Sequence, residues 1–225
     1  LQTTADVVLN TNRGIGLSEN STIEVDASTT LTYAGVIWDY WTHKGLTKTG
    51  NGILALSGNN VYGGYYTQGT TINAGTIRAD ASARILGWGK VVLPSSGAAT
   101  LDLNDYNVTT ALISGGGASS GIDLGSGTLT IKQYLASTFD GVISGSGSVV
   151  IEGNGHGLGL TRASTYTGGT SVGNVYLILS AVNTLSAAGD VTFTHSSGTL
   201  NLRASQSIGN LIGTSYTPSI YLQNA

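Results

Sequence analysis

The acidic side chains are few, and three of them are spaced in a way that could do chemistry. Asp102 and Asp105 lie close together in sequence, and Asp123 follows them after about the length of one short structural repeat. Paired carboxylates can hydrolyse glycosidic bonds. Asp102 also alternates with Leu101 and Leu103, which is the pattern of an ordinary strand residue that faces outward. A polysaccharide-degrading enzyme is therefore the alternative interpretation and not the main one.

The histidines and the sequence motifs give no sign of another type of catalytic site. His43, His156 and His195 are isolated in sequence, so a Ser/His/Asp set would have to be assembled from distant segments. The chain has no Gly-x-Ser-x-Gly, His-Glu-x-x-His or phosphate-binding Gly-Lys-Ser/Thr motif, and it has no cysteine. We predict a non-enzymatic protein with no catalytic residues, no metal site and no cofactor.

The composition narrows the possible partners. Lys and Arg number 9 against 12 Asp and Glu, so no basic stripe is available to neutralise nucleic-acid phosphates. The longest apolar run, Val175 to Leu179, is far too short to span a membrane. Glycine accounts for 34 of 225 residues and charged residues for only 9%, which points to a repetitive body built from strands and turns.

Short segments with alternating apolar residues recur along the chain, and Gly, Asn or Ser residues bound each of them. This pattern predicts strands that are separated by tight turns. The expected strands lie at residues 22–25, 53–56, 71–72, 76–79, 101–103, 129–131, 149–151 and 200–202.

A longer duplication, with an offset near one hundred residues, runs through the whole sequence. Its matched segments are 35–37 with 141–143, 62–64 with 166–169, 96–103 with 196–202, 111–115 with 210–213, and 122–124 with 220–222. Such internal repetition is typical of a solenoid, in which each coil buries its inward face against its neighbours. An antiparallel sandwich or barrel, the competing fold, does not predict the duplication.

We therefore predict an all-β fold, a right-handed parallel β-helix of about ten coils, each with roughly 20 to 25 residues. Residues 1–225 form a single β-solenoid, in which 1–115 is the first long unit and 116–225 is a degenerate second unit. We expect the chain to be a fragment or a processed product of a longer protein.

The two copies differ most at two aromatic insertions in the first copy. One follows Ile37 and the other follows Tyr62, and a further tryptophan replaces small residues of the second copy. These side chains either cover an apolar flank of the solenoid or form a contact surface, because exposed aromatics often dominate binding. The predicted binding or self-association patch consists of Trp38, Tyr40, Trp41, Tyr65, Tyr66 and Trp88.

The segment 45–62, Gly-Leu-Thr-Lys-Thr-Gly-Asn-Gly-Ile-Leu-Ala-Leu-Ser-Gly-Asn-Asn-Val-Tyr, followed by Thr-Thr-Ile-Asn-Ala-Gly-Thr-Ile at 70–77, resembles the autotransporter-associated β-strand repeat. Residues 12–17 and 30–37 look like the usual lead-in to that repeat, and 141–179 resembles a degenerate second copy. The resemblance implies the passenger region of a bacterial autotransporter or related surface protein, which folds as a β-helix outside the outer membrane. The family's membrane translocator is not part of this sequence.

The expected role is structural or adhesive, at the outer cell surface or outside the cell. The chain would act as a stalk, an adhesin or a self-associating fibre segment. Its expected partners are copies of itself, arranged end-to-end or side-by-side, or glycans or proteins of a host or cell surface, with no nucleic acid and no membrane insertion by this segment. A glycan-binding β-helix belongs with the enzyme as an alternative.

Overall fold

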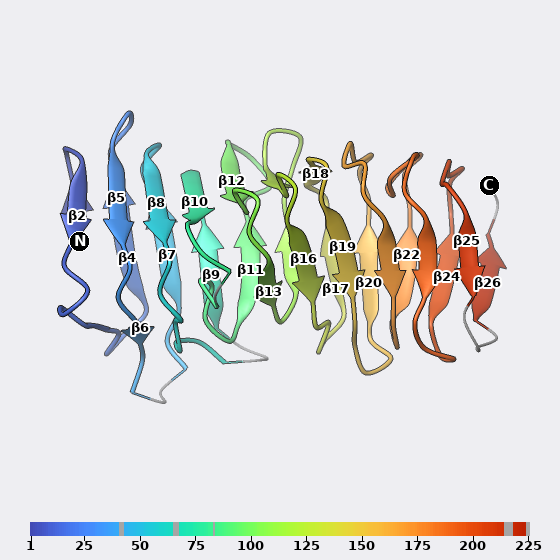
Figure 1. The fold of residues 1–225 in the computed structure, drawn as a ribbon, viewed down its shortest axis with the longest axis horizontal. Coiled ribbons are helices and arrows are strands. Elements are labelled where there is room, and N and C mark those ends of the chain that lie inside the picture. The colour runs from blue at the N-terminus through green and yellow to red at the C-terminus, as the bar shows by residue number, and fades with distance from the viewer. Residues whose placement is uncertain (41–42, 65–67, 83, 214–217, 224–225) are drawn as a thin grey trace.

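The fold is an elongated stack of β-strand coils that runs from one terminus to the other (Figure 1). The computed structural model describes residues 1–40, 43–64, 68–82, 84–213 and 218–223. Within these ranges there is no helix, and every strand pairing is parallel. The predicted all-β solenoid is confirmed, and the antiparallel alternative is wrong.

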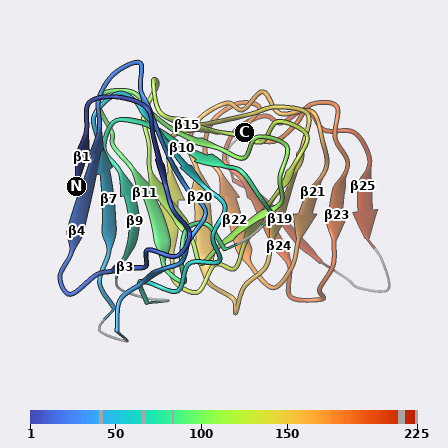
Figure 2. The ribbon, with the colours of Figure 1, turned by 60° about the vertical axis from the view of Figure 1, so that its left-hand side comes forward.

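Three long sheets form the sides of the stack, and their strands follow one another along its axis (Figures 1 and 2). Sheet A has eleven described strands: β1 (Gln2–Thr3), β4 (Ser21–Val25), β7 (Leu46–Thr49), β9 (Gly69–Ile72), β11 (Lys90–Leu93), β14 (Ile113–Gly115), β17 (Ser137–Phe139), β20 (Gly157–Leu160), β22 (Tyr176–Leu179), β24 (Thr199–Leu202) and β26 (Ser219–Leu222). Sheet B contains β2 (Val7–Leu9), β5 (Thr30–Tyr33), β8 (Ile53–Leu56), β10 (Gly75–Ala79), β12 (Ala99–Asp102), β15 (Gly121–Asp123) and β18 (Val142–Ser144).

The third side is divided between two sheets. Sheet C is short and contains β3 (Ile15–Gly16) and β6 (Ile37–Trp38). Sheet D begins further along the axis, with β13 (Val108–Thr110), β16 (Thr128–Ile131), β19 (Ser148–Ile151), β21 (Thr170–Val172), β23 (Val191–Phe193) and β25 (Leu211–Gly213). The third side therefore has a gap between the two sheets.

The register fixes the length of each coil. Leu158 pairs with Leu177, 19 residues later, and Ser21 pairs with Leu46, 25 residues later. Eleven described strands in sheet A agree with the predicted ten or so coils. The alternating strands place Leu, Ile and Val inward, where residues such as Leu54, Ile77 and Leu101 are inaccessible to solvent.

The corners between sheets A and B depend on glycine in two consecutive coils. Gly50 and Gly75 both have positive φ angles, of 71° and 68°, which other L-residues adopt only at a steric cost. A Cβ atom at Gly50 would collide with the carbonyl of Val25 in the preceding coil, and one at Gly75 would lie 2.5 Å from the Gly50 carbonyl oxygen. The close spacing of the coils thus adds a second reason for glycine at these corners.

The duplicated segments of the sequence occupy different sides of the solenoid. The segment of β12 in sheet B matches that of β24 in sheet A, and the segment of β14 in sheet A matches that of β25 in sheet D. Likewise β6 in sheet C matches β18 in sheet B. Along an offset of about one hundred residues, the chain completes four coils and then passes two of the three sides of the next coil. Equivalent strands of the two copies therefore lie on adjacent sides.

Candidate functional site

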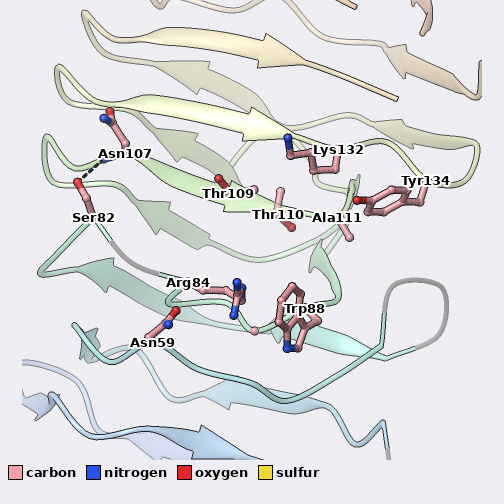
Figure 3. A pocket seen from close by; sticks show the side chains of 11 residues that line it. Asn59, Ser82, Arg84, Trp88, Asn107, Thr109, Thr110, Ala111, Lys132 and Tyr134 are labelled. Carbon is pink, nitrogen blue, oxygen red and sulfur yellow. Dashed lines mark hydrogen bonds between the residues drawn. The ribbon is translucent and has the colours of Figure 1, made fainter. Parts of the chain in front are cut away.

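A groove lies on the third side, between the end of sheet C and the beginning of sheet D. Trp38 forms an isolated bridge with Val61, and the described residues between β10 and β11 contain no strand. The groove has a volume of about 430 Å³. It is lined by Asn59, Ser82, Arg84, Gly87, Trp88, Asn107, Thr109, Thr110, Ala111, Lys132 and Tyr134 (Figure 3).

A buried asparagine holds the strandless segment in place. The Asn60 side chain accepts a hydrogen bond from the Ile37 amide (2.8 Å) and donates one to the Ile85 carbonyl (2.8 Å). Its backbone amide donates to the carbonyl of Arg84 (2.9 Å). Asn60 therefore links three successive coils, and it replaces the ladder bonds that a strand would have made.

The far end of the segment is fixed by backbone contacts. The Trp88 amide donates to the Tyr62 carbonyl (2.9 Å), and Gly87 has a φ of 67°. A Cβ atom at Gly87 would collide with that same carbonyl. The Tyr62 hydroxyl is buried against the Thr70 hydroxyl, 2.6 Å away, which itself donates to the Leu86 carbonyl. Burial raises the pKa of Tyr62, so the phenol stays neutral and donates to Thr70.

Arg84 and Trp88 form the floor of the groove. The guanidinium carbon of Arg84 lies 3.4 Å from the centroid of the Trp88 ring, which is a cation–π contact (Figure 3). Within the described ranges, the Arg84 side chain makes no ion pair, whereas Lys44, Arg78, Lys132 and Arg162 each contact a carboxylate. The guanidinium is thus held in one orientation by an aromatic ring while its N–H groups stay unused.

The opposite wall comes from the next two coils. Thr109 lies exposed on β13, and Lys132 and Tyr134 directly follow β16. The Lys132 ammonium pairs with the Glu152 carboxylate. The lining residues therefore include two cations, several hydroxyl and amide groups and no carboxylate, an arrangement that suits binding of a polar anion better than acid–base catalysis.

The structure places the predicted aromatic patch in two separate regions. The Trp38 and Tyr40 rings meet edge to face, with centroids 6.0 Å apart, and they cover the backbone of Gly14 and Gly16 in the preceding coil. Trp38 is half-buried, while 64% of Tyr40 is exposed. Trp88 lies two coils further along, in the groove. Trp41, Tyr65 and Tyr66 lie outside the described residues.

The three predicted aspartates lie close together, as their spacing indicated. Asp102 and Asp123 are register partners in sheet B. Each of the three carboxylates accepts a hydrogen bond from a turn amide: Asp102 from Asn104, Asp123 from Gly125 and Asp105 from Ser126. Burial, and to a lesser extent repulsion by Asp123, raises the pKa of Asp102, while the bond from the Asn104 amide lowers it. These aspartates therefore have a local structural role in the turns.

The histidines do not assemble. His43, His156 and His195 are all exposed and lie in three different coils. Among the described residues, no group of three or more His, Asp or Glu side chains is placed to hold a metal ion. The described residues contain no helix that is long and apolar enough to cross a membrane.

Comparison with known proteins identifies one segment of the chain as a known repeat. Residues 46–79, which form β7 to β10, match the family model of the passenger-associated-transport-repeat. The chain carries an autotransporter passenger repeat. This region coincides with the resemblance seen in the sequence at 45–62 and 70–77, so the predicted relationship is confirmed.

A curated relative extends this relationship beyond the repeat. The chain is 37% identical over 150 residues to the adhesin BmaC autotransporter of Brucella suis biovar 1 (strain 1330), an alignment that covers 65% of the chain and 4% of that protein. The chain thus spans a small part of the length of this relative. No solved structure matched the chain.

Several residues of the groove were missed by the sequence analysis. Arg84, Asn59, Asn107 and Lys132 come from four different coils, and nothing in their local sequence indicates that they line one groove. The only local signal is the spacing of Arg84 and Trp88, four residues apart in the segment where the second copy carries small residues.

Proposed function

We propose that the chain is a non-enzymatic segment of an autotransporter passenger, located at the bacterial surface or outside the cell, which acts both as a stalk and in adhesion. The observation that carries this proposal is the passenger repeat at 46–79, which forms strands β7 to β10 in the N-terminal half of a continuous solenoid. The 37% identity to part of an adhesin autotransporter supports the adhesive role.

The structure supports the stalk role through its hydrogen bonding. Each inner coil is bonded along parallel strands to the coil before it and the coil after it, and sheet A continues through all eleven described strands. Such a quasi-one-dimensional stack resists bending and offers a protease few exposed backbone segments. The loops on its sides can then present binding residues at a fixed distance from the cell.

A catalytic role has less support from the same residues. Asp102, Asp105 and Asp123 are engaged in turn hydrogen bonds, and the groove is lined by cations and neutral polar groups. Glycoside hydrolysis would require a carboxylic acid and a carboxylate facing each other across a substrate. If the purified chain released reducing ends from a panel of surface polysaccharides, this part of the proposal would be wrong.

The adhesive role can be tested with beads that carry the purified 225-residue chain at a known density. We expect severalfold more of these beads than albumin-coated beads to attach to cultured epithelial cells. Free chain in solution should compete with the attachment. A matched control carries Leu101→Asp, because a charge at this fully buried position should unfold the surrounding coils. Equal attachment of beads with the wild-type chain, the variant and albumin would refute the adhesive role.

A further inference from the structure

We propose that the groove binds a carboxylated sugar of an anionic glycan, and that Arg84 receives the carboxylate. This inference rests on the proposed adhesive function and deepens it by naming a ligand class and a site. It assigns binding to the groove, which is a different region from Trp38 and Tyr40.

Arg84 is prepared for this role by its surroundings. The Trp88 ring holds the guanidinium at 3.4 Å, and Asn60 fixes the backbone of Arg84 through a 2.9 Å hydrogen bond. A guanidinium whose orientation is already fixed loses little conformational entropy when it binds a carboxylate with two parallel hydrogen bonds. Among the described residues, no carboxylate occupies this position.

The charge around the groove favours an anion. The whole chain has a net charge of −3, yet the lining residues include Arg84 and Lys132 and no acidic residue. Lys132 is largely neutralised by Glu152, so Arg84 supplies most of the attraction. The groove is therefore a local positive site on a protein with a weakly acidic surface.

The neutral lining groups favour a sugar over a simple anion. Asn59, Asn107 and Thr109 are exposed and carry amide and hydroxyl groups that can pair with sugar hydroxyls. Tyr134 adds an aromatic ring at the wall opposite Arg84 (Figure 3). The volume of about 430 Å³ falls in the range of small-molecule sites and suits a short stretch of a glycan.

The second copy of the duplication provides natural replacement residues. In the matched alignment Thr184 stands where the first copy has Arg84, and Ala188 stands where it has Trp88. The backbone of the second copy forms a solenoid coil with these small residues. The substitutions Arg84→Thr and Trp88→Ala should therefore remove the binding groups while the coil stays folded.

The test is isothermal titration of the full chain with a hyaluronan tetrasaccharide and with 3′-sialyllactose, two probes that carry a carboxylate on different sugars. The matched neutral ligands are the carboxyl-reduced tetrasaccharide and lactose. We expect at least one carboxylated probe to bind about tenfold or more tightly than its neutral counterpart. Arg84→Thr and Trp88→Ala should each weaken this binding about tenfold, with unchanged circular dichroism.

The control variant is Arg203→Thr, which removes the same charge from an exposed position in the second copy. It should bind as the wild type does. Equal weakening by Arg84→Thr and Arg203→Thr would show nonspecific attraction and overturn the proposal. The absence of binding by both carboxylated probes would also overturn the proposal.

The outcomes for the groove and for adhesion are separable. If the chain attaches to cells and the Arg84→Thr variant attaches equally well, the glycan site is refuted and the adhesive role stands. If the carboxylated probes bind through Arg84 but the chain-coated beads do not attach to cells, the groove assignment stands and the adhesive role fails.

Discussion

A lysine inside the solenoid should make its stability increase with pH above neutrality. Lys48 on β7 is fully buried, and its ammonium donates to the carbonyls of Thr49 (2.8 Å), Gly50 (2.8 Å) and Ala74 (3.2 Å). Burial lowers the pKa of Lys48 from 10.5 to about 8, while the charge of Glu24 raises it. The repeat thus contains a titratable group at the corner between sheets A and B.

The direction of the change in stability with pH depends on which state, folded or unfolded, keeps the Lys48 proton. The folded chain releases the Lys48 proton at about pH 8, whereas the unfolded chain keeps it until about pH 10.5. Between these values the unfolded state binds more protons, so the free energy of unfolding rises with pH. Below pH 8 both states are protonated, and the full cost of burying the ammonium is present.

The size of the change in the free energy of unfolding follows from the same two pKa values of Lys48. Full linkage from pH 7 to pH 9.5 would raise the free energy of unfolding by about 2 kcal/mol. The corner residue Asn51 is exposed, so solvent screens part of the effect, and we expect about 1 kcal/mol. The measurement should stop at pH 9.5, because burial raises the pKa values of Tyr33 and Tyr166, and these tyrosines lower the stability once unfolded tyrosine ionises near pH 10.

The assay compares urea unfolding of the wild type and Lys48→Met at pH 7 and pH 9.5, followed by circular dichroism. Hydrogen exchange of the β7 and β9 amides gives a local measurement if the coils open separately. The gain of about 1 kcal/mol should be absent in Lys48→Met, whereas Lys90→Met controls for the loss of one positive charge from sheet A. A wild-type gain that persists in Lys48→Met would refute the reasoning.

Three further predictions concern the buried Asn60 behind the groove, the glycine corner at Gly50 and the terminal strand β26. Asn60→Leu should cost about 3 kcal/mol, because it leaves a buried amide and a buried carbonyl unpaired, and thermal unfolding would measure the loss. Gly50→Ala should cost about 2 kcal/mol or more, whereas Gly97→Ala, which has a positive φ but open space, should cost less, and an equal loss would contradict the role of coil spacing. In the isolated 225-residue chain, the exposed side chains of Ile220 (41%) and Leu222 (74%) on β26 should promote end-to-end association. Replacing both with lysine should lower the mass measured by light scattering at high concentration, and an unchanged mass would contradict this.

The local pattern of the sequence was sufficient to locate many strands. Alternating apolar residues bounded by Gly, Asn or Ser correctly predicted the strands at 53–56, 129–131 and 149–151. The glycine-rich stretch 153–159 lacks such an alternation, yet strand β20 begins in it at Gly157. Leu158 is buried there, and its packing into the core outweighs the low strand propensity of the adjacent glycines.

The binding groups of the candidate site could not be predicted in the same way. A groove depends on which residues of successive coils lie beside one another, and coil lengths here vary from 19 to 25 residues. Such variation shifts the register by several residues per coil, so sequence distance alone cannot place Arg84 opposite Lys132. The burial of Lys48 was also unpredicted, because a lysine between two threonines is typical of an exposed strand.

The sequence by itself determined that the chain is a β-solenoid with a passenger repeat, and it predicts a duplication of about one hundred residues. These properties depend on the alternation of apolar residues, on turn residues and on repeated segments, and all three can be recognised in the sequence. Only the tertiary structure decided which sides the two copies occupy. The buried hydroxyl of Tyr62 meets Thr70 in sheet A, whereas that of Tyr166 meets Thr170 in sheet D, 2.6 Å apart in both cases. The physical reason is that the duplicated unit is not a whole number of coils, so the second copy is turned about the axis relative to the first.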